Sequence, residues 1–272
     1  MSTAVARPQL SLVSPLGLLR SLAGFKVLVP FAALVAVWWA IKIGAGISDE
    51  VLVSPAAAFA AFIRLLTTGV LSEYASTSLR MIGISAVLSL AIGVPVGFAV
   101  GVNRYAARSL EGFLRFLQGV SGIAWLPLAI IWFGFSHTTT LVVVIYTLIV
   151  PIIFNTMIGV RAIPENYVLV LRSLGAGRLR LVTDVYLPGA LPSIVVGLRL
   201  GMGYGWRALI AAEMLVRRGG LGDLIFGART FNQIDRILVG MIIIGCLYIV
   251  VDRLIVQPIE NLTIARWGVL RK

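Results

Sequence analysis

Long apolar stretches alternate with short polar stretches along the whole chain. Six of them lie at 27–47, 79–102, 113–135, 141–160, 192–216 and 237–256. Each is long enough to cross a bilayer, which takes about 20 apolar residues in a helix. Their apolar residues run continuously instead of alternating with polar ones, as is typical of membrane helices rather than of barrel strands. The pattern therefore predicts an all-α polytopic membrane protein with six transmembrane helices.

Positive charge in the polar stretches indicates the orientation of the chain. Of the 23 Lys and Arg residues, the alternation of spans places fourteen on one side, among them Arg104, Arg161, Arg172 and Lys272. Because short cytoplasmic loops carry an excess of Lys and Arg, both termini are predicted to be cytoplasmic. Arg217 and Arg218 fall on the outer side and oppose this rule. The expected organisation is a cytoplasmic tail at 1–26, a transmembrane domain at 27–260 and a cytoplasmic tail at 261–272.

Composition agrees with a membrane protein and excludes several other classes. Hydrophobic residues make up 59% of the chain and charged residues 12%, whereas soluble domains carry about 25% charged residues. The net charge of +12 lies in short loops, so it indicates retention at the membrane and lipid contact rather than a nucleic-acid partner. One cysteine, Cys246, and one histidine, His137, provide neither a disulfide nor a metal site. The chain also lacks the G-x-S-x-G motif of serine hydrolases.

The polar segment 162–191, between the fourth and fifth apolar stretches, has more internal order than a simple loop. Pro164 and Glu165 favour the start of a helix. Tyr167, Leu171 and Leu174 recur at helical spacing and give that helix one apolar face, and Gly175 is placed to end it in a left-handed conformation. A second helical piece is expected at 178–187, before Pro188 and Pro192 return the chain to the membrane. Such a segment suits docking into a groove of another protein, or lying as an amphipathic helix on the bilayer.

Within the spans, small residues and isolated polar residues identify candidates for packing and transport. Small residues at four-residue spacing let helix backbones approach closely. Pro95 is expected to kink its span, and Pro127 to kink or break the third span. Charged groups inside spans usually face protein or water. Helix packing is therefore expected at Gly93, Gly97, Gly101, Gly197, Gly201 and Gly205, and a translocation pathway at Trp125, Asn155, Trp206, Arg207 and Glu213. The alternatives are core packing for Trp125, an interhelical hydrogen bond for Asn155, pairing with a carboxylate for Arg207 and a position at the outer interface for Glu213.

The segment 162–191 also carries a family pattern. Gly175, nine residues, Val185, one residue and Leu187-Pro188 resemble the later part of the "EAA" signature of ABC importer permeases. The runs 197–201, 211–214 and 125–134 resemble the nitrate, sulfonate, taurine and bicarbonate branch of the type I importers. The glutamate of the signature is missing, because Leu169-Val-Leu171 occupies the E-A-A positions.

This resemblance implies a function and a set of partners. The chain is expected to be a homodimeric permease subunit of type I fold in the bacterial plasma (inner) membrane. Its partners are expected to be a cytoplasmic ATPase dimer, which holds ATP and Mg²⁺, and a periplasmic or lipid-anchored solute-binding protein. No phosphate-binding G-x-x-x-x-G-K-[ST] loop occurs in this chain, so no ATP cofactor or enzymatic activity is expected of it. The resemblance assigns ATPase coupling to Leu169, Arg172, Ser173, Leu174, Gly175, Ala176, Leu187 and Pro188. A small, anionic solute is expected, and a stand-alone secondary transporter or channel is the alternative.

Overall fold

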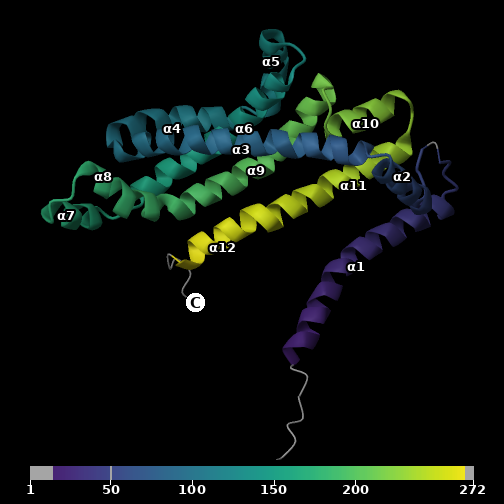
Figure 1. The fold of residues 1–272 in the computed structure, drawn as a ribbon, viewed down its shortest axis with the longest axis horizontal. Helices are drawn as coiled ribbons and strands as arrows, with labels where there is room; N and C mark the ends of the chain where they lie inside the picture. Colours follow the sequence, from purple (N-terminus) through teal and green to yellow (C-terminus); the bar gives the residue numbers. More distant parts are fainter. Residues whose placement is uncertain (1–14, 50, 267–272) are drawn as a thin grey trace, which may run out of the picture. The chain divides into compact units, whose positions relative to one another are not determined.

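The computed structural model describes residues 15–49 and 51–266. The outer parts of both expected tails, 1–14 and 267–272, lie outside the described residues. The chain divides into two compact units, residues 1–59 and 60–272. Helices form nearly all of the described chain, and the all-α prediction is confirmed (Figure 1).

The first unit contains α1 (Pro15–Gly44) and the start of α2 (Pro55–Thr67). α1 covers residues 27–44 of the span expected at 27–47 and ends three residues before the expected end. Lys42 lies near the end of α1, where its ammonium group donates to the carbonyl of Ile47 and pairs with the Asp49 carboxylate at 2.6 Å. This pairing lowers the pKa of Asp49 below its usual value. Beyond it, Ser54 accepts a hydrogen bond from the backbone N–H of Ala57, so the predicted N-cap of α2 is confirmed.

The second unit is built on three long helices, α3 (Val70–Val102), α6 (His137–Arg161) and α9 (Leu187–Val216). They run side by side, and α6 packs against both of the others (Figure 1). Leu148 and Ile152 of α6 are completely buried in the main apolar cluster, together with Leu209 of α9. Because α6 has neighbours on two sides, it is the most buried of the long apolar helices.

Glycines on both sides of α6 allow this close packing. A Cβ atom built on Gly97 of α3 would lie 2.6 Å from the carbonyl oxygen of Ile153. On the opposite side, a Cβ atom on Gly197 of α9 would lie 3.0 Å from the carbonyl oxygen of Pro151. The six glycines named from the sequence all face α6: Gly93, Gly97, Gly101, Gly197, Gly201 and Gly205. The three glycines of α3 and the three of α9 therefore let both helices pack closely against α6.

The third apolar stretch is not one continuous helix. Residues 113–135 were expected to form a span that is kinked or broken at Pro127; the helix is broken, but the break lies at residues 120 and 121. Helix α4 (Arg104–Gly119) is followed by a 3₁₀ turn η1 (Gly122–Trp125) and α5 (Leu126–Phe133), with a bend of 81° between the two parts. The chain breaks at Val120 and Ser121, which have extended backbone conformations. Pro127 lies in the first turn of α5, where the missing N–H breaks no helical hydrogen bond.

The remaining helices begin earlier than the apolar pattern indicated. The expected loop 136–140 contributes the first turn of α6, because the Ser136 hydroxyl caps it at Thr139. After α7 (Glu165–Ser173), a continuous helical segment runs from α8 (Arg178–Leu181) through a π-helical turn η2 (Val182–Tyr186) into α9. The expected start of the fifth span near Pro192 was therefore too late. The wider π turn precedes Pro188, which cannot donate a helical hydrogen bond.

The last part of the second unit contains α10 and a long final helix. It comprises α10 (Leu221–Thr230), α11 (Ile234–Val251), a π-helical turn η3 (Asp252–Val256) and α12 (Gln257–Arg266). In the described chain, four continuous helices are long and apolar enough to cross a membrane: 70–102, 137–161, 178–216 and 234–261. The bent pair 105–119 and 122–133 adds a fifth if it forms one broken span. The chain is therefore a multi-pass membrane protein.

Candidate coupling segment and membrane cavity

Gly175 ends α7 through a Schellman motif. Its φ is +77°, in the left-handed region predicted from the sequence, and this conformation is confirmed. The N–H of Gly175 donates to the carbonyl of Arg172, and the N–H of Ala176 donates to the carbonyl of Leu171. These two bonds satisfy carbonyls that the end of the helix leaves without an intrahelical partner. Residues 174–177 form the turn between α7 and α8.

Apolar side chains of α7 and of the turn point away from the rest of the second unit. No residue of α7 is buried. Leu174 is 78% exposed, and Tyr167, Leu169 and Val170 are exposed as well. Leu171, which was expected to share a face with Tyr167 and Leu174, is half-buried on the inner side. The exposed face therefore uses Val170 in its place, at three residues from Tyr167 and four from Leu174.

The inner side of the segment is fixed to the ends of the long helices. Leu181 and Val185 are buried, and the ring of Tyr186 makes an edge contact with that of Phe98 at 5.6 Å. Leu187 is exposed and Pro188 half-buried where η2 continues into α9. A Cβ atom on Gly189 would lie 2.8 Å from the side chain of Ile163. α8, η2 and α9 form one continuous helical segment, which connects the turn at Gly175 with a membrane helix.

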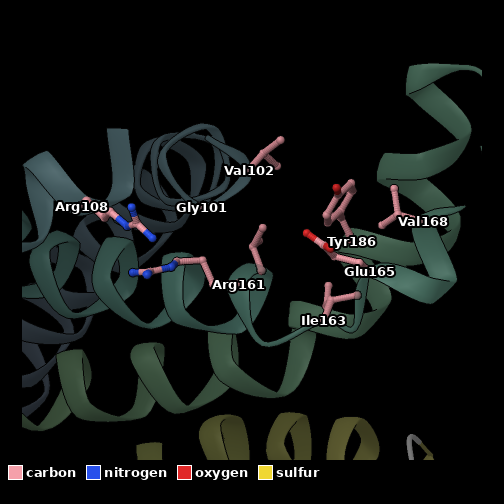
Figure 2. Close-up of a pocket in the computed structure, with 9 residues that line it drawn as sticks. Gly101, Val102, Arg108, Arg161, Ile163, Glu165, Val168 and Tyr186 are labelled. Carbon is pink, nitrogen blue, oxygen red and sulfur yellow. The ribbon is translucent and has the colours of Figure 1, made fainter. Parts of the chain in front are cut away.

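A cavity of about 340 Å³ lies where this segment meets the ends of α3, α4 and α6. Figure 2 shows Arg108 and Arg161 entering it from α4 and α6, and Glu165 and Tyr186 entering it from the coupling segment. Arg161 pairs with Glu111 at 3.1 Å. Glu165 therefore lines this cavity.

A larger cavity, of about 670 Å³, lies among the long helices at the break between α4 and η1. It brings together two of the pathway candidates, Asn155 of α6 and Arg207 of α9. The amide nitrogen of Asn155 donates to the carbonyl of Pro151 at 2.8 Å. This hydrogen bond lies within α6, so the interhelical hydrogen bond expected for Asn155 was wrong. We refer to this space as the Arg207 cavity.

The other pathway candidates lie elsewhere. Trp125 lines a smaller apolar cavity of about 260 Å³ and packs against Tyr146, whose side chain also lines the Arg207 cavity. Trp206 is buried in the main apolar cluster, with its ring 6.0 Å from that of Tyr248 of α11. Neither Trp206 nor Glu213 lines the Arg207 cavity.

Glu213 is the centre of a buried polar network that joins three helices. Glu213 is only 3% exposed. The Ser78 hydroxyl of α3 lies 2.8 and 2.9 Å from its two carboxylate oxygens, and the N–H of Gly222 of α10 donates at 3.0 Å. The N–H of Leu221 in turn donates to the Ser78 oxygen at 2.9 Å. Sequence analysis missed Ser78, because a single serine in an apolar helix gives no signal of its distant partner.

Long packed apolar helices, with a basic, glycine-broken segment at one end, define the class: an integral membrane protein with a transport-type permease architecture. The chain belongs to the family of binding-protein-dependent transport system inner membrane components, whose model matches residues 89–256. The family resemblance noted in the sequence is therefore confirmed, and a location in the plasma membrane follows from it.

Three curated relatives indicate the branch of the family. The taurine transport system permease protein TauC of Escherichia coli is 30% identical over 79% of this chain and 80% of its own length. The putative aliphatic sulfonates transport permease protein SsuC of Escherichia coli is 33% identical over 86% of this chain and 89% of its own. The nitrate import permease protein NrtB of Synechocystis is 30% identical over 67% and 66%, respectively. The inward-facing MetNI methionine transporter structure matches 72% of this chain with a TM-score of 0.49.

Proposed function

We propose that this chain is the permease subunit of an ATP-driven, binding-protein-dependent importer for a small anionic solute. The relatives named for taurine, sulfonate and nitrate transport support the solute class. Two copies of the chain enclose one pathway, with a solute-binding protein on the outer side and an ATPase dimer on the cytoplasmic side. ATP and Mg²⁺ bind to the ATPase, and alternating access of the spans moves the solute.

The exposed apolar face of the coupling segment is the observation that carries this proposal. Tyr167, Val170 and Leu174 form a short ridge that is exposed in the isolated chain, and Arg172 lies in the last turn of the same helix. A rigid helix with such a ridge suits a groove on another protein. Leu169, Ser173 and Ala176 complete the segment proposed to contact the ATPase. Leu187 and Pro188 link it to α9. Closure of the ATPase dimer then moves α9 through the continuous helix from Arg178.

The docking ridge can be tested by co-purification with the ATPase of the same transporter. Leu174→Glu places a charge on the ridge, and we expect it to abolish co-purification and solute-stimulated ATP hydrolysis. Phe231→Glu is the matched control, because Phe231 is 74% exposed and follows α10, outside the coupling segment. An ATPase that binds and responds normally to the Leu174→Glu chain contradicts docking through this ridge.

Coupling itself is tested at Gly175. No atom outside the turn lies within 4 Å of a Cβ atom at this position, so only the positive φ restricts the side chain. Asn tolerates this conformation, whereas β-branched Val does not. We expect Gly175→Val to lose solute-driven transport while the chain still assembles in the membrane, and Gly175→Asn to retain most of it. Full transport by Gly175→Val overturns the coupling role.

The stand-alone transporter is not favoured, because ion coupling needs titratable groups on the pathway. The described Arg207 cavity contains no carboxylate, and Glu213 is held in its own network. Solute uptake into liposomes that contain only this chain separates the two functions. Uptake without ATPase and binding protein contradicts the importer.

A further inference from the structure

Arg207 is a cation inside a membrane helix for which the described chain provides no anion. Arg207 lies nine positions before the end of α9. Its side chain makes no hydrogen bond, ion pair or ring contact with any other described residue. A charged group within a span is costly unless it meets water or an opposite charge. The energetic question is therefore what compensates this guanidinium group.

The positions of the carboxylates also disfavour a counter-ion from a second copy of the chain. Most of the eleven Asp and Glu residues are already held by partners. They are Asp49, Glu111, Asp223, Asp235, Asp252 and Glu260, which form ion pairs, and Glu213, which has its hydrogen-bond network. Glu73 lies in the first turn of α3, Glu165 and Asp184 lie in the coupling segment, and Glu50 is outside the described residues. In the described chain, no carboxylate from the middle of a span remains for Arg207.

The walls of the Arg207 cavity are arranged for an anion. Arg207 is the only charged residue among those that line it. Gln118 and Tyr204 also line it, and neither forms a side-chain hydrogen bond within the described residues. Both can donate hydrogen bonds, and the guanidinium group offers five N–H donors and no acceptor. The remaining lining includes Val120, Ile123, Val150, Phe154 and Leu200, which form apolar walls.

We propose that Arg207 and these donors form an oxyanion-binding site within the membrane part of the permease. A planar guanidinium group binds two oxygens of a carboxylate, nitrate or sulfonate at once. A cavity of about 670 Å³ also has room for a short apolar tail beside the oxyanion. This inference rests on the proposed function in taking the occupant to be the imported solute. The permease thereby selects for negative charge itself, after the binding protein has released the solute.

The charge of the cavity can be measured without the ATPase, the binding protein or knowledge of the natural solute. In a Cys246→Ser background, Ser121→Cys places a reporter thiol on the cavity wall. The purified full-length chain in nanodiscs is then treated with methanethiosulfonate reagents of either sign. The ratio of the anionic sulfonatoethyl rate to the cationic trimethylammonium rate, divided by the same ratio for a free thiol in solution, exceeds one if the cavity attracts anions. We expect Arg207→Gln to lower the ratio of the two rates about tenfold or more, and Arg207→Lys to preserve most of it.

Two controls make the measurement specific. Arg253→Gln removes the same charge from an exposed position on η3, and we expect it to leave the rate ratio at position 121 unchanged. A reporter made by Thr230→Cys, at the exposed end of α10, is expected not to respond to Arg207→Gln. A ratio at position 121 that changes less than twofold with Arg207→Gln, in a chain that remains monodisperse, overturns the proposal. A monodisperse Arg207→Lys chain that loses the ratio also overturns it.

Binding is tested with a pair of similar small molecules. Methanesulfonate is an oxyanion, and dimethyl sulfone is a neutral molecule of almost the same shape. We expect millimolar methanesulfonate to slow modification of the Ser121→Cys reporter severalfold when Arg207 is present, and dimethyl sulfone to have no effect. Equal protection by both molecules, or protection by neither, contradicts an oxyanion site. Because no ATPase is present, these results do not depend on whether ATP coupling through Gly175 is correct.

Discussion

The close approach of α3 and α6 at Gly97 allows a quantitative test of the packing. A Cβ atom at Gly97 would lie 2.6 Å from the carbonyl oxygen of Ile153 and 2.7 Å from the Cβ of Thr156. Ordinary van der Waals contact begins at 3.4 Å, so Gly97→Ala forces the two helices apart by about 0.8 Å. Overpacking of this kind costs about 1–3 kcal/mol. The backbone oxygen cannot move aside as a flexible side chain could.

The same substitution on the same helix provides the control. Gly83 of α3 has no atom within 4 Å of a Cβ atom built on it. Gly83→Ala and Gly97→Ala both gain about 0.5–1 kcal/mol from the higher helix propensity of Ala. Since this gain cancels between the two variants, the difference in their stabilities reports the helix contact alone. We therefore expect Gly97→Ala to be less stable than Gly83→Ala by about 1–3 kcal/mol.

The difference can be measured by denaturation of the purified chain in mixed micelles, followed by tryptophan fluorescence. Gly101→Ala, with its nearest contact at 2.8 Å, is expected to fall on the same side as Gly97→Ala. Equal stability of the Gly97→Ala and Gly83→Ala chains refutes the close helix contact. Equal destabilisation of both also refutes it, because Gly83 has no neighbour to displace.

Two further substitutions test the contacts that join the helices. Ser78→Ala leaves the buried Glu213 carboxylate with only the N–H of Gly222 as a donor, and it removes the acceptor of the Leu221 N–H. We expect it to cost about 1–3 kcal/mol in the same denaturation assay. Ser72→Ala is its control, because that exposed hydroxyl bonds only to the carbonyl of Gly69; similar effects of the two changes contradict the network. Arg199→Gln removes ion pairs with α12 and η3 at a half-exposed position, and we expect a loss of only about 0.2–1 kcal/mol. A loss several times larger contradicts a solvent-screened pair.

Sequence alone determined the features that depend on local chemistry. The continuous apolar runs predicted an all-helical membrane protein, because a backbone in lipid has to satisfy its own hydrogen bonds. Ser54 and Gly175 predicted a helix start and a helix end, since a capping hydroxyl and a glycine with positive φ act within a few residues. The spacing from Gly175 to Pro188 indicated the family. These signals need no knowledge of distant parts of the chain.

The boundaries of the membrane helices required the tertiary structure. Hydropathy does not separate α4, η1 and α5, because both sides of the break at Ser121 are apolar. The break packs closely on α6: a Cβ atom on Gly122 would collide with the Thr147 hydroxyl. At the other end of the molecule, the π turn ahead of Pro188 extends α9 into the coupling segment, where proline alone predicted a boundary.

Tertiary structure also decided the surroundings of each polar residue in the spans. Arg207 and Glu213 are similar in sequence, since both are single charges in the same apolar run. Folding places Glu213 against Ser78 and Gly222, where hydrogen-bond donors satisfy it. It places Arg207 at a cavity with donors and no carboxylate. Ser78 is separated from Glu213 by 135 positions, and periodicity along one helix carries no information about so distant a partner.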